Sequence, residues 1–340
     1  MTDDSVTVVA PGSATPDGII GAAARFERAN ADGGVNGRRI LFEKGQEDTG
    51  EPTSFALLPA GDARDGSVPV FGAPHDDLSF CGVGEAFAVN GCQAQPSNIW
   101  GTLVSLAAGT AGTAFVVPEA TPDGDPFYDQ VAASFEAAGF TVVTFDESVG
   151  DSESAGLDFV VDADPDLVVY LSGSEGTLEA ATGLRDAGYE GAQTFRTGYT
   201  PAFAAAASEA GLDGVTVLTD FAPFESADEN PIVQRLIDDV REYEETEGMP
   251  ETPLSGEVAA GYWSADAFLV ALDATGSDLT VERFLQTADD DFEWRAEGTA
   301  GPATWPRNRD VPVPCGALVE VAGDGTFEVA VPYSCGRNLP

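Results

Sequence analysis

Apolar residues along the chain occur in two patterns, helical three- and four-residue spacing and short continuous runs, which predict alternating helices and strands. In residues 19–29 they recur at three- and four-residue spacing, which predicts an amphipathic helix beginning just after Asp17. An apolar run at residues 6–10 precedes this helix, and residues 39–44 follow it as a second strand. Because strand, helix and strand in this order make a βαβ unit, the opening of the chain predicts a parallel sheet.

The alternation continues through the rest of the chain. The continuous apolar run at 167–171, between two helical patterns, is typical of a parallel strand covered on both faces. Residues 317–321 and 326–330 flank the turn Gly323-Asp-Gly325 and predict a closing hairpin. Further strands are expected at 68–71, 113–117, 140–145, 193–197 and 215–219, and helices at 51–63, 99–108, 127–138, 157–163, 177–187, 201–210, 232–245, 256–274 and 281–288.

Length and charge narrow the class of protein. A chain of 340 residues exceeds the usual size of a single core, so two domains are expected. The formal net charge of −43 argues against nucleic acid and anionic membranes as partners, because both attract basic surfaces. We interpret this charge as a solubilising surface suited to high salt rather than as a cation-binding device.

The cysteines and the apolar runs bear on location and cofactors. Four cysteines fall as two local pairs, Cys81 with Cys92 and Cys315 with Cys335, which favours two disulfides, and therefore export, over buried free thiols. The sequence has no C-x-x-C motif and a single histidine, so no metal or cofactor is expected. No run approaches the roughly 20 apolar residues of a transmembrane helix. The first residues do not form a signal peptide.

The opening of the chain also carries a family resemblance. It reads APGSATPDG, then an alanine-rich helix, then ERANADGGVNGRRI and EDTGEPT. Through these segments the chain resembles the substrate-binding proteins of branched-chain amino acid ABC transporters. These are similar to the leucine/isoleucine/valine-binding protein and belong to the type I periplasmic-binding superfamily. Later stretches match less literally but in the right order, so the resemblance covers nearly the whole chain.

The resemblance implies an α/β fold of two doubly wound parallel-sheet lobes joined by three hinge crossings. The first lobe is expected to comprise residues 1–95 and 224–305, and the second residues 96–223 and 306–340. It also implies a monomeric, non-enzymatic protein outside the cytoplasm, in the periplasm or at the cell surface, with or without a lipid anchor. Such a protein captures a small polar molecule (an amino acid, an amide or a small carboxylate) by hinge closure and presents it to ABC permease subunits.

Ligands of doubly wound sheets bind at the carboxyl ends of the strands, and five loops of this sequence meet that rule. They comprise residues 11–15, 72–77, 118–128, 172–176 and 198–201. In the first loop, Ser13 can donate to a ligand carboxylate or cap its own loop. In the second, His75 beside Asp76 is either part of a ligand contact or an ordinary loop histidine.

The last three loops hold the residues that the resemblance assigns to the second lobe. Tyr128 matches the tyrosine that packs on the ligand in this family, the alternative being an ordinary tyrosine on a helix face. Ser172, Ser174 and Glu175 match the next contact loop, where Glu175 is either the partner of a ligand ammonium or a solvated carboxylate. Tyr199 stands where amino-acid-binding members often carry an acidic residue. This departure argues against an amino acid ligand unless Glu175 or Asp76 supplies the charge.

Two other functions use features of the same sequence. The fold also serves as a ligand-sensing domain that passes closure to a signalling partner. A hydrolase is the less favoured alternative, because the run Ser172-Gly-Ser174-Glu-Gly176 resembles a nucleophile elbow but lacks the glycine that the G-x-S-x-G motif requires at position 172. The chain also has no Walker A motif for binding nucleotide phosphates.

Overall fold

The computed structural model describes residues 4–11, 14–46, 55–57, 68–73, 78–109, 112–117, 127–143 and 159–340. The chain divides into two compact units. Unit 1 consists of residues 1–95 and 227–313, and unit 2 of residues 96–226 and 314–340. Because unit 2 is inserted between the two halves of unit 1, the chain passes from one unit to the other three times.

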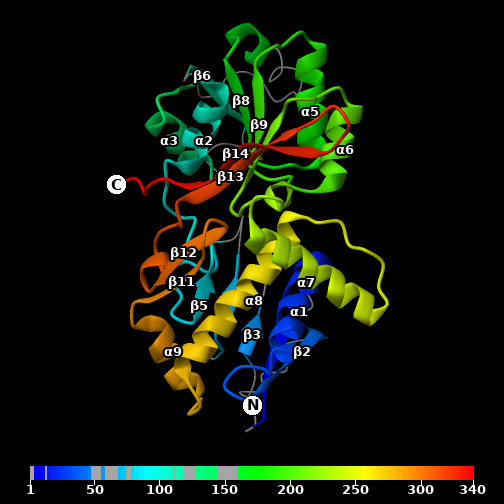
Figure 1. Ribbon diagram of the computed structural model, residues 1–340. Coiled ribbons are helices and arrows are strands. Elements are labelled where there is room, and N and C mark those ends of the chain that lie inside the picture. Colours follow the sequence, from blue (N-terminus) through cyan, green and yellow to red (C-terminus); the bar gives the residue numbers. More distant parts are fainter. Residues whose placement is uncertain are drawn as a thin grey trace. The chain divides into compact units, whose positions relative to one another are not determined.

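Unit 1 is built on a parallel sheet with the strand order β2-β1-β3-β4-β5 (Figure 1). Val6, Val8 and Ala10 of β1 have no exposed surface, as expected for a strand near the centre of a sheet. The weak helix expected at 51–63 is wrong at its centre, because a three-residue strand there pairs with β1 and β4. The strands are β1 (Ser5–Pro11), β2 (Arg39–Gln46), β3 (Phe55–Leu57), β4 (Val70–Gly72) and β5 (Ala86–Ala88).

The two main helices of unit 1, α1 (Pro16–Ala31) and α8 (Gly256–Thr275), lie side by side although they are far apart in sequence (Figure 1). Glycines permit this approach. A Cβ added at Gly21 would lie 3.0 Å from the Tyr262 nitrogen, and one added at Gly261 would lie 2.7 Å from the Gly18 carbonyl carbon. The expected start of α1 is corrected by two residues, because Thr15 is its N-cap and accepts from the Gly18 N–H.

The remaining helices and strands of unit 1 complete an aromatic core. They are α7 (Pro231–Glu247), α9 (Val281–Asp289), the antiparallel pair β11 (Phe292–Ala296) and β12 (Ala300–Trp305), and the 3₁₀ turn η3 (Arg307–Arg309). Phe71 and Phe87 stack at a centroid distance of 4.7 Å, and the edges of neighbouring rings surround them. The core therefore joins the sheet to α8 and β12.

Residues 306–313 belong to unit 1, whereas the sequence analysis placed them in the second lobe. Two contacts explain the difference. Arg309 Nη2 pairs with Asp289 Oδ1 at 2.5 Å, and the Val313 N–H donates to the Asn90 carbonyl at 2.9 Å. The third crossing of the chain therefore falls at residues 313–314 rather than at 305–306.

Unit 2 is built on a second sheet, with the strand order β14-β13-β10-β9-β8-β6-β7. Neighbouring strands from β7 to β10 pair in parallel. At one side of the sheet β13 pairs antiparallel with β10, and β14 pairs antiparallel with β13. The strands are β6 (Thr113–Val117), β7 (Thr141–Val143), β8 (Leu167–Tyr170), β9 (Ala192–Phe195), β10 (Thr216–Thr219), β13 (Cys315–Val321) and β14 (Phe327–Cys335).

Helices cover both faces of the parallel part of this sheet. Leu167 and Val169 of β8 pack in one buried cluster with Leu103 of α2 and Phe135 of α3. Tyr170, the last residue of β8, stacks on Phe195 of β9, which contacts α6. The helices are α2 (Ile99–Ala108), α3 (Tyr128–Ala137), α5 (Glu175–Asp186) and α6 (Pro201–Glu209), with a helical stretch at 159–163 and the 3₁₀ turn η2 (Phe224–Ser226). The predicted type of fold, doubly wound α/β, is confirmed.

Both predicted disulfides are present. Cys315 and Cys335 are register partners on β13 and β14, with their Cα atoms 4.0 Å apart, so they close the predicted hairpin. Cys81 and Cys92 have Cα atoms 5.0 Å apart in unit 1. This disulfide encloses β5, a strand that the apolar pattern did not predict. Among the residues that the structure describes, no helix is both long enough and apolar enough to cross a bilayer.

Candidate functional site

The loops that follow parallel strands meet at one edge of the sheet, where doubly wound folds bind ligands. In unit 2 the described loops of this kind are residues 171–174, 196–200 and 220–226. The Gly173 N–H donates to Thr197 Oγ1 at 3.0 Å, which joins the first two loops. A Cβ at Gly173 would lie 2.6 Å from the Gly198 Cα, so the close approach requires glycine.

The predicted contact residues Ser172, Ser174 and Glu175 do lie together at this edge. Ser174 is the N-cap of α5, and its Oγ accepts from the Thr177 N–H at 3.4 Å. The Ser172 hydroxyl contacts that of Ser174 at 3.2 Å, and Glu175 follows with an exposed side chain. The hydroxyls therefore cap a helix and bond to one another, and their contact with a ligand stays a prediction.

Tyr199 is engaged within unit 2. Its hydroxyl donates to Glu225 Oε2 at 2.6 Å and accepts from the Phe224 N–H at 2.7 Å. Its ring stacks on Phe224 with a centroid distance of 6.0 Å. Burial raises the pKa of the Tyr199 hydroxyl, and desolvation of the Glu225 carboxyl where it meets that hydroxyl raises the carboxyl's pKa. Glu225 was not singled out from the sequence, because it lies 26 residues beyond its partner.

Arg196 is a second residue that the sequence analysis missed. It directly follows β9, and only 8% of its surface is exposed. The guanidinium carbon lies 4.7 Å from the centroid of the Phe127 ring and 5.7 Å from that of the Trp100 ring. Burial lowers the pKa of Arg196 to about 10, and the nearby Asp220 carboxylate opposes this shift. The guanidinium therefore remains a cation at neutral pH.

Tyr128 is the first residue of α3 and packs in the buried cluster of unit 2 with Trp100 and Leu103. Only 5% of its surface is exposed, and burial raises the pKa of its hydroxyl. That hydroxyl has no hydrogen-bond partner among the residues that the structure describes. The Tyr128 ring therefore forms part of the unit 2 core. Its contact with a ligand stays a prediction.

In unit 1 the N-termini of α1 and α8 are tied together at the carboxyl end of β1. The Thr15 hydroxyl donates to Glu257 Oε2 at 3.0 Å, and the Ser255 hydroxyl donates to Asp17 Oδ2 at 2.9 Å. Ser255 also caps α8. The three first-lobe candidates, Ser13, His75 and Asp76, lie outside the described residues, so their roles stay predictions.

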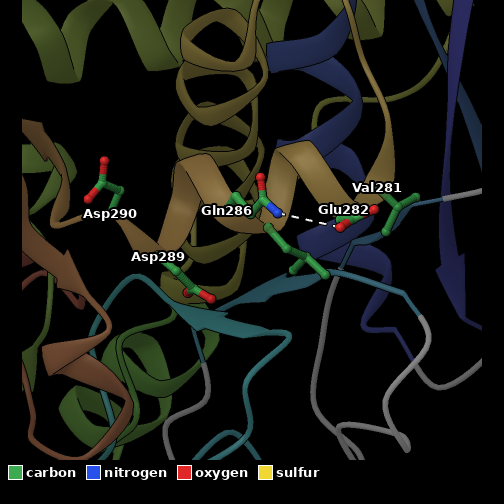
Figure 2. Close-up of a pocket in the computed structure, with 6 residues that line it drawn as sticks. Val281, Glu282, Gln286, Asp289 and Asp290 are labelled. Carbon is green, nitrogen blue, oxygen red and sulfur yellow. Dashed lines mark hydrogen bonds between the residues drawn. The ribbon is translucent and has the colours of Figure 1, made fainter.

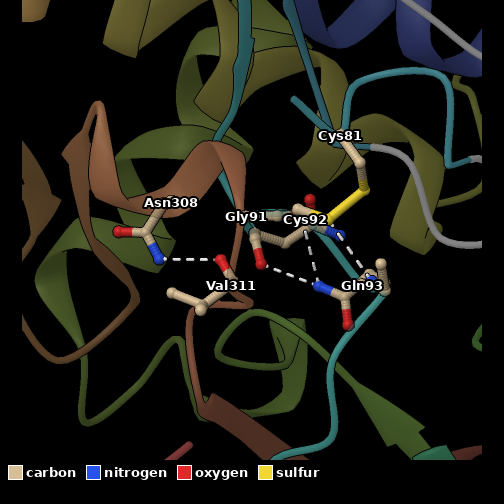
Figure 3. Close-up of a disulfide and its surroundings, with 8 residues drawn as sticks. Cys81, Gly91, Cys92, Gln93, Asn308 and Val311 are labelled. Atoms are coloured by element: carbon tan, nitrogen blue, oxygen red, sulfur yellow. Dashed lines mark hydrogen bonds between the residues drawn. A yellow bond between two sulfur atoms is a disulfide. The ribbon is translucent and has the colours of Figure 1, made fainter. Parts of the chain in front are cut away.

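The disulfide of unit 1 lies beside the segment that leads into the first crossing (Figure 3). Gln93 Nε2 donates to the Asn90 carbonyl at 2.7 Å. The Asn308 amide donates to the Val311 carbonyl at 3.1 Å, and Gly91 forms an isolated bridge with Pro312. The segments that lead into the first and the third crossing are therefore hydrogen-bonded to each other within unit 1.

A hollow of about 680 Å³ lies on α9 (Figure 2). Residues of this helix and its C-cap line it, among them Glu282, Asp289 and Asp290. The Gln286 side-chain amide donates to Glu282 Oε1, one turn earlier in α9, at 3.5 Å. Among the described residues, no group of three or more histidine, cysteine or acidic side chains is arranged to hold a metal ion. The acidic side chains that line this hollow therefore do not identify a ligand for it.

Two units, each with a helix-covered parallel sheet and polar loops at the carboxyl ends of its strands, define an α/β protein of the binding-protein class. The chain belongs to the periplasmic binding protein family, because the sequence model of that family matches residues 49–326. The resemblance inferred from the opening residues is thereby confirmed. Among curated protein sequences, none is similar enough to count as a match.

Solved structures share the fold at low sequence identity. A branched-chain amino acid transporter substrate-binding protein from Streptococcus pneumoniae, in complex with isoleucine, is 14% identical with a TM-score of 0.70, over 98% of this chain and 100% of that chain. A fatty acid ABC transporter substrate-binding protein from Thermomonospora curvata is 14% identical with a TM-score of 0.70, over 99% and 94%. A solute-binding protein from R. palustris, in complex with benzoate, is 17% identical with a TM-score of 0.64, over 98% of both chains. The fold is therefore the type I periplasmic binding fold.

Proposed function

We propose that this protein is the solute-binding component of an ABC importer and works outside the cytoplasm. The observation that carries the proposal is the match to the periplasmic binding protein family over residues 49–326. Solved proteins of the same fold are described as transporter proteins for branched-chain amino acids and for fatty acids, and one holds benzoate. All three names describe capture of a small molecule.

The proposed mechanism is capture by closure. A small polar solute binds at loops that follow the carboxyl ends of the strands, and hinge closure encloses it. The closed form is then recognised by the permease, and the solute shifts the equilibrium by binding that form more tightly. The two disulfides support export, because disulfides persist in oxidising compartments.

A thermal-shift screen of the purified chain tests this function. Amino acids, amides, carboxylates, aromatic acids and sugars are compared at fixed ionic strength. A solute at 100 times its Kd should stabilise the folded protein by about 2.7 kcal/mol, which appears as a saturable rise in Tm. Absence of a saturable shift with every class, from a protein that circular dichroism shows to be folded, would contradict solute capture.

A permease experiment separates import from sensing. Addition of the liganded protein to vesicles that contain the cognate permease and ATPase should stimulate ATP hydrolysis, whereas the protein without solute should stimulate it less. Saturable solute binding with no stimulation of the permease would instead favour a sensor that reports to a signalling partner.

A further inference from the structure

Two of the three crossings between the units lie at a bond to proline. The first falls between Gln95 and Pro96, and the third between Val313 and Pro314. A proline ring fixes φ of its own residue and restricts the residue before it to extended conformations. The second crossing, at 226–227, contains no proline. Few backbone torsions can therefore turn at the first and third crossings.

In unit 1 the segments that lead into these two crossings are bonded to each other. The Cys92 N–H donates to the Asn308 carbonyl at 2.9 Å. The Val313 N–H donates to the Asn90 carbonyl, also at 2.9 Å. Cys92 is in addition joined to Cys81 by a disulfide (Figure 3). The unit 1 ends of both crossings are therefore fixed relative to each other.

In unit 2 the segment after β14 bonds to the first residue beyond each of the same two crossings. The Leu339 N–H donates to the Pro96 carbonyl at 2.9 Å. The Gly336 N–H donates to the Pro314 carbonyl at 2.7 Å. We call residues 336–339 the strap, because they connect the unit 2 ends of the first and third crossings.

Asn98 bonds to the strap instead of to its own helix. It is the N-cap of α2, but its side chain makes no capping hydrogen bond. Its Oδ1 accepts from the Arg337 N–H at 2.7 Å, and its N–H donates to the Arg337 carbonyl at 3.0 Å. Asparagine at an N-cap usually accepts from its helix, as Asn230 does in α7. A Cβ added at Gly336 would clash with Asn98 Oδ1, so this approach of the strap requires glycine.

We propose that the strap ties the first and third crossings into one hinge and thereby limits the range of motion between the two units. The inference rests on the proposed function for the use of this hinge, which is capture by closure. Cys335 ends β14 and is bonded to Cys315, which directly follows Pro314, so the strap is covalently anchored beside the third crossing.

Fixed ends change what the hinge can do. When both ends of each crossing are held, the units turn about one pair of links instead of two independent ones, which narrows the set of open conformations. A narrower open state loses less conformational entropy when it closes around a solute. The strap therefore favours closure without touching the solute.

Distances between the two units test the strap in the absence of solute. Exposed positions on α7 and α6 receive spin labels through Glu242→p-acetylphenylalanine and Glu209→p-acetylphenylalanine, which leaves the disulfides intact. Double electron–electron resonance then gives the distribution of distances between the labels. Asn98→Ala removes the acceptor of the strap, and Gly336→Ala displaces the strap by a clash. Each should broaden the distribution about 1.5-fold or more, because the crossings then move independently.

Three matched variants separate the strap from general effects on unit 2. Asn98→Asp keeps an oxygen that accepts from the Arg337 N–H and should behave as the wild type does. Gly323→Ala adds a Cβ that meets only Asp213, at an ordinary 3.7 Å, and should also leave the distribution unchanged. The double variant Asn98→Ala/Gly336→Ala should broaden it by less than the sum of the two single effects, because the added Cβ no longer meets the Asn98 amide.

The outcomes distinguish this inference from solute capture. Folded Asn98→Ala and Gly336→Ala variants with the wild-type distribution overturn the strap, as does equal broadening by Gly323→Ala, while solute capture stands on its own thermal-shift screen. If Gly336→Ala does not fold, the comparison of Asn98→Ala with Asn98→Asp decides. A protein that shows the expected broadening but binds no solute keeps the strap and overturns solute capture.

Discussion

At the scale of single residues, two tyrosines of unit 2 have buried rings but differ in what their hydroxyls contact. The Tyr199 hydroxyl accepts one hydrogen bond and donates another, and so satisfies the Phe224 N–H. The Tyr128 hydroxyl has no hydrogen-bond partner among the described residues. Removal of a buried partner costs more than removal of a group that bonds to nothing.

Replacement of each tyrosine by phenylalanine should therefore have different effects. Tyr199→Phe should lower the free energy of unfolding by about 1–3 kcal/mol, because the Phe224 N–H loses its acceptor. Tyr128→Phe should leave it unchanged or raise it by less than about 1 kcal/mol. Urea unfolding followed by circular dichroism measures both. Equal losses for the two variants would contradict this assignment of the hydroxyls.

Asp239 of α7 gives a pH dependence whose direction follows from its burial. Only 4% of Asp239 is exposed, and desolvation raises its pKa in the folded protein, although the Tyr262 hydroxyl donates to it at 2.6 Å. A carboxyl with a raised pKa binds more protons in the folded state. Its contribution to stability is therefore full below the unfolded pKa of about 3.9 and is lost as the pH rises through the folded pKa.

The Asp239→Asn variant should remove this loss. The free energy of unfolding of the variant, relative to the wild type, should rise as the pH increases from about 4 through the raised pKa. Urea unfolding at a series of pH values measures the difference. Tyr262→Phe is the matched variant, because it removes a donor that lowers the Asp239 pKa. In this variant the stability contributed by Asp239 should be lost at a higher pH than in the wild type. A difference that falls with pH would contradict the raised pKa.

At the scale of helices and strands, the contact between α1 and α8 depends on glycine. A Cβ at Gly21 would come within 3.0 Å of the Tyr262 nitrogen and still closer to the Val258 carbonyl oxygen. Both are backbone atoms, which cannot move aside as a side-chain end can. Gly21→Ala should therefore lower the free energy of unfolding by at least about 2 kcal/mol, measured by urea unfolding.

Gly176→Ala is the control for this prediction. Gly176 is the second residue of α5, and an added Cβ would meet nothing within 4 Å. Alanine there should be neutral or should stabilise the protein by up to about 1 kcal/mol, because it restricts the unfolded chain. A Gly21→Ala variant as stable as Gly176→Ala would show that α1 and α8 do not pack this closely.

Periodicity predicted the long helices and buried strands well, and it failed where pairing over long distances decides the structure. Residues 99–108 and 113–117 have the predicted bounds. The three-residue strands Phe55–Leu57 and Ala86–Ala88 are too short to show a period, and exist because they pair with β4. The segment 306–313 was misplaced because its contacts to Asp289 and Asn90 cannot be read from local sequence.

The candidate site was predicted at the level of loops rather than of interactions. The rule for strand ends indicated the loops that hold Ser172 and Tyr199, and the structure places these loops after the parallel strands β8 and β9, while their contact with a ligand stays a prediction. It did not indicate Arg196, since one arginine after a strand is not a motif, nor Glu225, whose partner is fixed only by the fold. The scarcity of positive charge around Arg196 was the one signal in the sequence that could have drawn attention to it.

At the scale of the whole molecule, the net charge of −43 predicts stabilisation by salt. Repulsion among carboxylates destabilises the compact state, and added ions screen it. Tm should rise as sodium chloride increases from about 0.05 M to 0.5 M, measured by circular dichroism, because the Debye length falls below the spacing of surface charges. A Tm independent of salt would contradict this interpretation.

Tetramethylammonium chloride is the control for the salt prediction. It screens charge as sodium chloride does, but its bulky cation does not fit among carboxylate ligands. An equal rise in Tm with both salts would show screening. A rise with sodium chloride alone would show that the acidic surface binds Na⁺, contrary to our interpretation of the charge.

The insertion of unit 2 within unit 1 has a consequence for the order in which the protein can fold during synthesis. The first 95 residues contain α1, but its packing partner α8 begins only at Gly256. Unit 2 in turn lacks β13 and β14 until the chain has reached Cys335. On the ribosome, therefore, neither unit has all of its helices and strands until synthesis is nearly finished, so the last packing steps of both units come late.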